Sequence, residues 1–150
     1  MISVQQKDFD VAAEIAALGG EGGEIGAIVS FTGIVRGDDG LKAMTLEHYP
    51  GMTEKALEDI EAQAQARWPL KASRIIHRTG RLEPGDNIVL VITASAHRQA
   101  AFEAASFLMD YLKTEAPFWK LEERPEGTRW VEAREADDAA RSRWEKRAAE

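Results

Sequence analysis

The chain has 150 residues, 44% hydrophobic and 30% charged, which is typical of one soluble globular domain. A formal net charge of −7 argues against broad nucleic-acid binding, because that function needs a basic surface. No apolar run reaches the ~20 residues of a membrane-spanning helix, and the first residues lack the pattern of a signal peptide. We therefore expect a cytoplasmic protein that binds neither membranes nor nucleic acids.

The sequence contains no cysteine. This excludes disulfides, thiolate zinc sites, a catalytic thiol and a persulfide carrier. Histidines and carboxylates do not stand at metal-binding spacing either, so we expect no metal and no cofactor. If the protein handles sulfur, another molecule has to bring it.

The first third of the chain predicts one helix and two strands. Residues 8–18 begin with aspartates and carry apolar residues at helical spacing, and the glycine-rich run 19–23 reads as a connection, not a phosphate-binding loop. Residues 25–36 alternate as a strand, in which Gly33 indicates a bulge or a close backbone approach. Residues 43–49 alternate as well and are interpreted as the antiparallel partner of that strand.

A second helix is expected next, with Thr53 as its cap and Met52 and Leu57 as a hydrophobic staple. Its buried face is expected to consist of Leu57, Ile60, Ala64 and Trp68. A short strand then leads to His77 and Arg78. We interpret this pair as structural, because it precedes a turn and has no apolar stripe or lysine beside it in the sequence.

The stretch 87–120 organises the rest of the chain. Residues 88–92 form an unbroken apolar run that predicts a central strand covered on both faces. A long helix starts near Arg98, capped by Ser95 or a neighbour. Its stripe toward the sheet is expected to be Phe102, Ala105, Met109 and Leu112. At 100° per residue Lys113 lies about 20° from Phe102, hence on that stripe, although a lysine whose stem packs while its ammonium reaches water is the ordinary alternative.

Pro117 ends this helix, and the strand that follows places Lys120 on the same face as Phe118 and Glu122. Two lysines, Lys113 and Lys120, thus bracket a proline turn, which is a plausible anion pocket. An exposed strand lysine is the commoner alternative for Lys120 taken alone.

The end of the chain predicts a hairpin of residues 119–123 and 128–133 around a turn with Pro125 second and Gly127 fourth. Residues from about 134 to 150 are highly charged and are expected to form a frayed helix or a tail. Helices and hairpins together indicate the α+β class, with a mixed or antiparallel sheet, in a single domain over residues 1–150.

Several cations stand at strand or helix ends of this acidic chain and are consistent with a site for a phosphate-bearing small molecule. They are Arg36, His97, Arg98, Lys113, Lys120 and Arg134. Lys113 follows His97 by 16 residues on one helix, so ~1.5 Å per residue separates their backbones by ~24 Å. If both serve one small ligand, a second copy of the chain has to supply His97 and Arg98, which predicts a symmetric homodimer.

Five segments of the chain resemble the MoaE-like family, the catalytic (large) subunits of molybdopterin synthase. They are FTGIVR (31–36), LEHYPGMTEKAL (46–57), SAHRQAAFEA (95–104), YLKTEAPFWK (111–120) and RPEGTRWVEA (124–133). The resemblance implies an α/β hammerhead fold with an additional antiparallel β subdomain. It also implies a homodimer within a heterotetramer, flanked by two copies of a small ubiquitin-like sulfur-carrier subunit.

The resemblance further implies that the carrier's C-terminal Gly-Gly thiocarboxylate supplies sulfur to cyclic pyranopterin monophosphate, which forms the dithiolene of molybdopterin without a metal. Lys113 and Lys120 would be catalytic, by stabilising negative charge or by shuttling protons. The substrate-binding set would comprise these two lysines with Arg36, His97, Arg98, Arg134, Phe31, Met109, Leu121 and Glu122. A non-catalytic homodimer that binds an anionic metabolite is the alternative.

Leu121 and Ile34 occupy positions that are often basic in the family. These two departures leave the named lysines and arginines intact and bear on the charge at the rim of the pocket.

Overall fold

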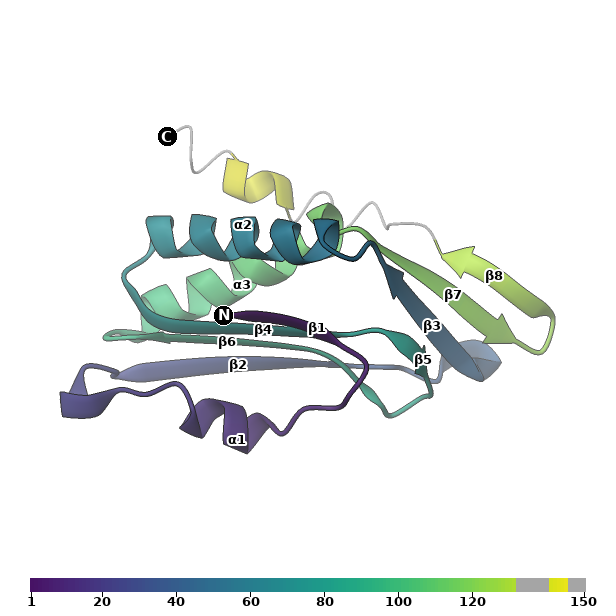
Figure 1. Cartoon of the computed structure of the whole chain (residues 1–150), viewed down its shortest axis with the longest axis horizontal. Helices are drawn as coiled ribbons and strands as arrows, with labels where there is room; N and C mark the ends of the chain where they lie inside the picture. The colour runs from purple at the N-terminus through teal and green to yellow at the C-terminus, as the bar shows by residue number, and fades with distance from the viewer. Residues whose placement is uncertain (132–140, 146–150) are drawn as a thin grey trace.

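The computed structural model describes residues 1–131 and 141–145 (Figure 1). They form two four-stranded sheets, three α-helices within residues 1–131 and a short helical segment at 141–145. The first sheet has the order β1 (Ile2–Gln5), β4 (Leu70–Arg78), β6 (Asn87–Ser95) and β2 (Ala27–Ile34). The second has the order β5 (Gly80–Leu82), β3 (Ala43–His48), β7 (Phe118–Arg124) and β8 (Gly127–Val131). The helices are α1 (Val11–Ala16), α2 (Met52–Arg67) and α3 (Arg98–Glu115).

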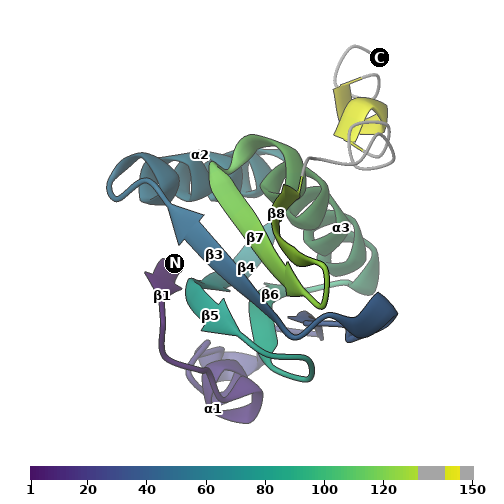
Figure 2. The ribbon, with the colours of Figure 1, turned by 90° about the vertical axis from the view of Figure 1, so that its right-hand side faces the viewer.

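The α+β class with an additional antiparallel subdomain is confirmed. The first sheet is mixed, because β1 runs parallel to β4 while every other pair is antiparallel, and the second sheet is antiparallel throughout. In Figure 1, α2 and α3 cover one face of the first sheet and α1 lies on the other. Figure 2 shows the second sheet at one end of the first.

The central strand β6 is buried on both faces, as its apolar run predicts. Val89 and Val91 pack into the core under α2 and α3, while Leu90 and Ile92 pack with Ile76 against residues around α1. The β2 bulge predicted at Gly33 is confirmed, since the register with β6 shifts between Gly33 and Ile34. A Cβ at position 33 would lie 2.6 Å from Val89 Cγ1, so this backbone approach admits only glycine without a shift.

The predicted pairing of residues 43–49 with the preceding strand is wrong. β2 pairs with β6, whereas β3 pairs with β5 and β7. Met44 and Leu46 of β3 form a separate core with Val35 and Leu82. Alternation correctly marked a half-buried strand, but period 2 does not say which strand is the partner.

The expected cap of α2 is also wrong. The helix starts at Met52 after Gly51, whose N–H is accepted by the Glu54 carboxylate, and Met52 is 65% exposed, so no staple forms. Thr53 is instead fully buried. Its hydroxyl accepts the Tyr49 N–H at 3.0 Å and donates to the Pro117 carbonyl at 3.1 Å, which ties the start of α2 to the turn before β7.

The buried face of α3 differs from the predicted stripe. Ala105 and Leu112 are buried as expected, but Phe102 is 61% exposed. The core-facing residues are Ala101, Ala104, Ala105, Phe107, Leu108, Tyr111 and Leu112. The helix is therefore turned about its axis relative to the prediction. Its N-cap residue is His97, whose side chain makes no capping hydrogen bond. The Ser95 hydroxyl donates to the Pro69 carbonyl instead.

Residues 141–145 form a helical segment on the outside of α2 and α3 (Figure 1). Trp144, expected in a charged tail, is 3% exposed, with ring contacts to Trp68 and Phe107, and its indole N–H donates to Asp110 at 2.6 Å. Charge dominates the composition here, but one large aromatic residue is enough to dock the segment. Residues 141–145 are thus helical, which is one of the two predicted forms, and Trp144 docks them on the main core.

A single residue, Thr79, separates β4 from β5 and so joins the two sheets. It is buried, and its N–H donates to the Gln5 carbonyl at 2.9 Å. Gly80 follows with φ 89°, a left-handed conformation that turns the chain into the second sheet. No helix within residues 1–131 and 141–145 is long and apolar enough to cross a membrane.

Candidate active site

The two lysines flank the connection between α3 and β7, as predicted. Lys113 lies in the last turn of α3, and Lys120 is the third residue of β7. The chain leaves the helix at Ala116, whose backbone is extended, and the Thr53 hydroxyl holds the carbonyl of Pro117. The turn that separates the lysines is thus fixed to a neighbouring helix.

The exposure of the two lysines differs. Lys113 is exposed and shares a helix side with exposed Phe102, so it does not sit on the core-facing stripe of an isolated chain, contrary to prediction. Lys120 is half-buried. It pairs across the strands with Leu46, which is fully buried, so its stem starts from the inner face of the second sheet.

A buried histidine, His77 on β4, lies close to both lysines. Its imidazole stacks on Phe118, with ring centroids 3.8 Å apart and planes 17° apart. Burial lowers its pKa from 6.5 to about 4; a hydrogen bond with the Arg78 carbonyl opposes this shift, and the charges of Lys120 and Lys113 add to it. The histidine is therefore neutral at pH 7.

His77 has no lysine beside it in the sequence, but the fold brings Lys120 and Lys113 near it. Strands β4 and β7 belong to different sheets and are about 40 residues apart in the chain, so local pattern gave no signal of this contact.

Glu122 and Leu121, both assigned to substrate binding, have other surroundings than Lys120. The Glu122 carboxylate is 2.6 Å from Arg124 and 3.9 Å from Arg129, with only 13% of its side chain exposed. Leu121 alternates to the opposite face of β7 and pairs with Thr45 and Trp130. A substrate-binding role for these two residues stays a prediction.

The remaining cations divide between two ends of the first sheet. Arg36 is exposed just after β2, 3.3 Å from Asp38, at the end where β6 begins and α3 returns with Lys113. His97 and Arg98 are exposed at the opposite end, where α3 starts. Because α3 is one continuous helix, ~1.5 Å per residue keeps His97 ~24 Å from Lys113 within one chain.

The two apolar residues expected to line the pocket lie on neighbouring elements. Phe31 is 43% exposed on the face of β2 that α3 covers, and Met109 of α3 packs half-buried against the main core. Arg134 lies outside the described residues. Within residues 1–131 and 141–145 no cluster of His, Asp and Glu could hold a metal ion.

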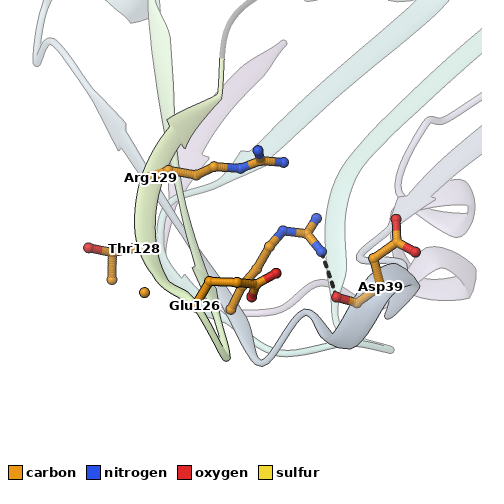
Figure 3. A pocket seen from close by; sticks show the side chains of 6 residues that line it. Asp39, Glu126, Thr128 and Arg129 are labelled. Carbon is orange, nitrogen blue, oxygen red and sulfur yellow. Dashed lines mark hydrogen bonds between the residues drawn. The ribbon is translucent and has the colours of Figure 1, made fainter.

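A hollow of about 370 Å³ beside the β7–β8 hairpin is a different place from the lysines (Figure 3). Asp39, Glu126, Thr128 and Arg129 line it together with Arg124 and Gly127. The Arg124 guanidinium donates to the carbonyls of Asp38 and Asp39 at 2.9 and 3.1 Å and also pairs with Glu122, so it already has partners. We interpret the Arg124 contacts around this hollow as structural support for the β7–β8 hairpin.

Known proteins resemble this chain over almost its whole length. The family model of the MoaE protein matches residues 4–115. A "Molybdopterin synthase catalytic subunit" from Pseudomonas aeruginosa is 59% identical over 147 residues, covering 96% of this chain and 98% of that protein. The solved molybdopterin biosynthesis MoaE protein from Burkholderia ambifaria has a TM-score of 0.83 at 56% identity, covering 95% of this chain and 96% of that one.

A solved complex of subunits 1 and 2 of molybdopterin-converting factor from Helicobacter pylori shares the fold. Its TM-score is 0.74 at 20% identity, with 89% of this chain and 91% of that chain covered. With the family model matched over most of the chain and relatives above half identity, the chain belongs to the MoaE family of molybdopterin synthase catalytic subunits.

Proposed function

We propose that this cytoplasmic protein transfers sulfur from the C-terminal thiocarboxylate of a small ubiquitin-like carrier subunit to cyclic pyranopterin monophosphate. Two such transfers form the dithiolene of molybdopterin. The observation that supports this proposal is the position of Lys113 and Lys120 on either side of a turn that the Thr53 hydroxyl fixes, with both charges acting on one buried histidine. The absence of cysteine agrees with a donor that arrives with its own sulfur.

The ammonium groups of Lys113 and Lys120 supply positive charge next to the thiocarboxylate and next to the carbonyl oxygen that gains negative charge during the reaction. The thiocarboxylate sulfur forms a bond to a carbon of the pterin precursor while a carbon–oxygen bond of that carbon breaks, and the oxygen leaves with the phosphate or as water. Water then hydrolyses the acyl carbon–sulfur bond, so that the sulfur stays on the pterin and the carrier leaves as a carboxylate. The carbonyl oxygen of the carrier tail gains negative charge as water attacks, and Lys113 or Lys120 stabilises it. The other lysine holds the thiocarboxylate or moves a proton. Two cations placed before the reaction need no reorganisation during it.

The phosphate and pterin of the substrate are assigned to Arg36, His97 and Arg98, with Arg134 as a further cation. Guanidinium groups suit phosphate because they donate two parallel hydrogen bonds. Phe31 and Met109 are assigned to the apolar lining. Since His97 and Arg98 lie ~24 Å from Lys113 in one chain, the proposal requires them from a second copy.

The surface of β2 supports such a second copy. β2 is one of the two edge strands of the first sheet, and Phe31 and Ile34 on it are 43% and 52% exposed. Phe102 on α3, 61% exposed, adds apolar surface on the helix that neighbours β2. An edge strand with exposed apolar side chains is suited to association with another chain. Two carrier subunits on this homodimer would complete a heterotetramer.

The test is a reconstituted assay with thiocarboxylated carrier and the cyclic precursor, read as dithiolene product. Lys113→Ala and Lys120→Ala are each expected to lower product formation at least a hundredfold with the fold intact by circular dichroism. Lys55→Ala is the matched control, because Lys55 is an exposed lysine on α2 that pairs with Asp59 at 3.7 Å. Product at the wild-type rate from both lysine variants would refute the assignment, and precursor binding without turnover by the wild type would favour the non-catalytic alternative.

A further inference from the structure

His77 is a buried polar residue that no step above uses. It is 5% exposed and lies on the face of β4 that α2 and α3 cover, beside Ile75 of the main core. Strands in such a position carry apolar side chains as a rule, and a buried imidazole needs a partner for its polar atoms. A histidine buried here therefore needs a specific partner for its imidazole.

The backbone next to the imidazole fixes its orientation. Nδ1 lies 2.8 Å from the Arg78 carbonyl oxygen, and a carbonyl only accepts, so Nδ1 carries the proton and Nε2 keeps its lone pair in the neutral ring. Arg78 is itself held, since its guanidinium donates to the carbonyls of Gln6 and Asn87 at 2.9 to 3.0 Å. The ring is anchored to a rigid part of the first sheet.

One face of the same ring packs against the strand that carries Lys120. Phe118, the first residue of β7, stacks on the imidazole at 3.8 Å, and alternation puts Lys120 on the same side of β7 as Phe118. The stack is a contact between the two sheets, from β4 to β7. The position of the imidazole therefore sets the distance between the start of β7 and the first sheet. It also sets the position of the Lys120 backbone, from which the side chain extends.

Three basic side chains from other elements act on the His77 imidazole. They belong to Lys120 on β7, Lys113 on α3 and His48 on β3, the last of which lies 3.4 Å from Glu54. A neutral ring at this place gives support without adding a third cation to the lysine pair. A lysine or arginine at position 77 could also support the strand, but its positive charge would repel Lys113 and Lys120.

We propose that His77 is a positioning residue for sulfur transfer, whose uncharged imidazole carries Phe118 and thereby holds Lys120 beside Lys113. This inference rests on the proposed function, since it assigns His77 a part in placing the same two lysines. His77 touches neither the carrier tail nor the pterin in this role.

The test compares three variants in the reconstituted assay. His77→Ala removes the ring, His77→Phe keeps a flat ring against Phe118, and Ile76→Ala removes a fully buried side chain from the neighbouring position on the opposite face of β4. We expect His77→Ala to lower kcat at least tenfold with less than a twofold change in KM for the precursor. His77→Phe should stay within about threefold of the wild-type kcat, and Ile76→Ala should keep it, at a temperature where circular dichroism shows every variant folded.

The outcomes separate the inference from the function on which it rests. No product from the wild-type protein refutes the proposed function. Product from the wild type with an unchanged kcat in His77→Ala, an equal loss in Ile76→Ala, or a loss in His77→Phe as large as in His77→Ala overturns the positioning role. If His77→Ala does not fold, Phe118→Leu removes the same stack from the other side, and an unchanged kcat in that variant overturns the role as well.

Discussion

The titration of His77 predicts a specific loss of stability in mild acid. Burial holds the pKa of this histidine at about 4 in the folded protein, against 6.5 when exposed, so between these values the unfolded chain binds a proton that the folded chain refuses. The stabilisation from the neutral ring is complete above pH 6.5 and is lost as pH falls toward 4. The pKa difference corresponds to a loss of roughly 3 kcal/mol of unfolding free energy below both pKa values, and of about 2 kcal/mol at pH 5.

The measurement is urea unfolding of the wild type and of His77→Phe at pH 8 and pH 5, at one protein concentration. The phenylalanine variant keeps the ring contact with Phe118 but cannot titrate, while His48, His97 and the carboxylates remain in both proteins. Their contributions therefore cancel in the comparison. We expect the wild type to lose about 2 kcal/mol more of its unfolding free energy than the variant over this range. Equal losses in the two proteins would refute the reasoning, because they would show that the imidazole is not held neutral by burial.

Three further predictions concern stability and assembly. Trp144→Ala should lower the free energy of unfolding by about 3–5 kcal/mol in urea titrations, because it removes an aromatic side chain that is only 3% exposed. A change within about 0.5 kcal/mol would show that the segment 141–145 does not dock in solution. Gly33→Ala should lower the thermal midpoint, because its Cβ would meet Val89 Cγ1 at 2.6 Å, and an unchanged midpoint would contradict this close packing. Mixing Lys113→Ala with His97→Ala chains should restore about a quarter of the wild-type activity if pockets are shared between copies, because half of the dimers are mixed and each has one intact pocket. No recovered activity after subunit exchange would count against sharing.

Local periodicity predicted those parts of the fold that depend on near neighbours. The run 88–92 gave the buried strand β6, Gly33 gave the bulge, and the Pro125–Gly127 turn gave the β7–β8 hairpin, because each signal spans only a few residues. The lysines on either side of Pro117 were found in the same way. The five segments that resemble the MoaE-like family predicted the family of the chain, and the similarity to known proteins confirms it.

Contacts between distant segments could not be read from the sequence. Strand β3 alternates equally well whether it pairs with β2 or with β7, and only the tertiary packing decides. Phe102 was placed in the core because hydrophobicity alone does not tell a buried helix face from an exposed one. His77 beside the lysines and Trp144 on the helices depend on chain segments 30 or more residues away.

The single buried residue between β4 and β5 has a consequence for how ligands enter. Thr79 belongs to a continuous backbone that runs through both sheets, so a hinge between them would have to break its hydrogen bond to Gln5 and open the core of Val35 and Leu82. The frame that carries Lys120 is thus preorganised before any guest arrives. On the proposed function, most of the entropic cost of complex formation would then fall on the carrier tail. The rate of tail insertion, not domain closure, is expected to govern the encounter.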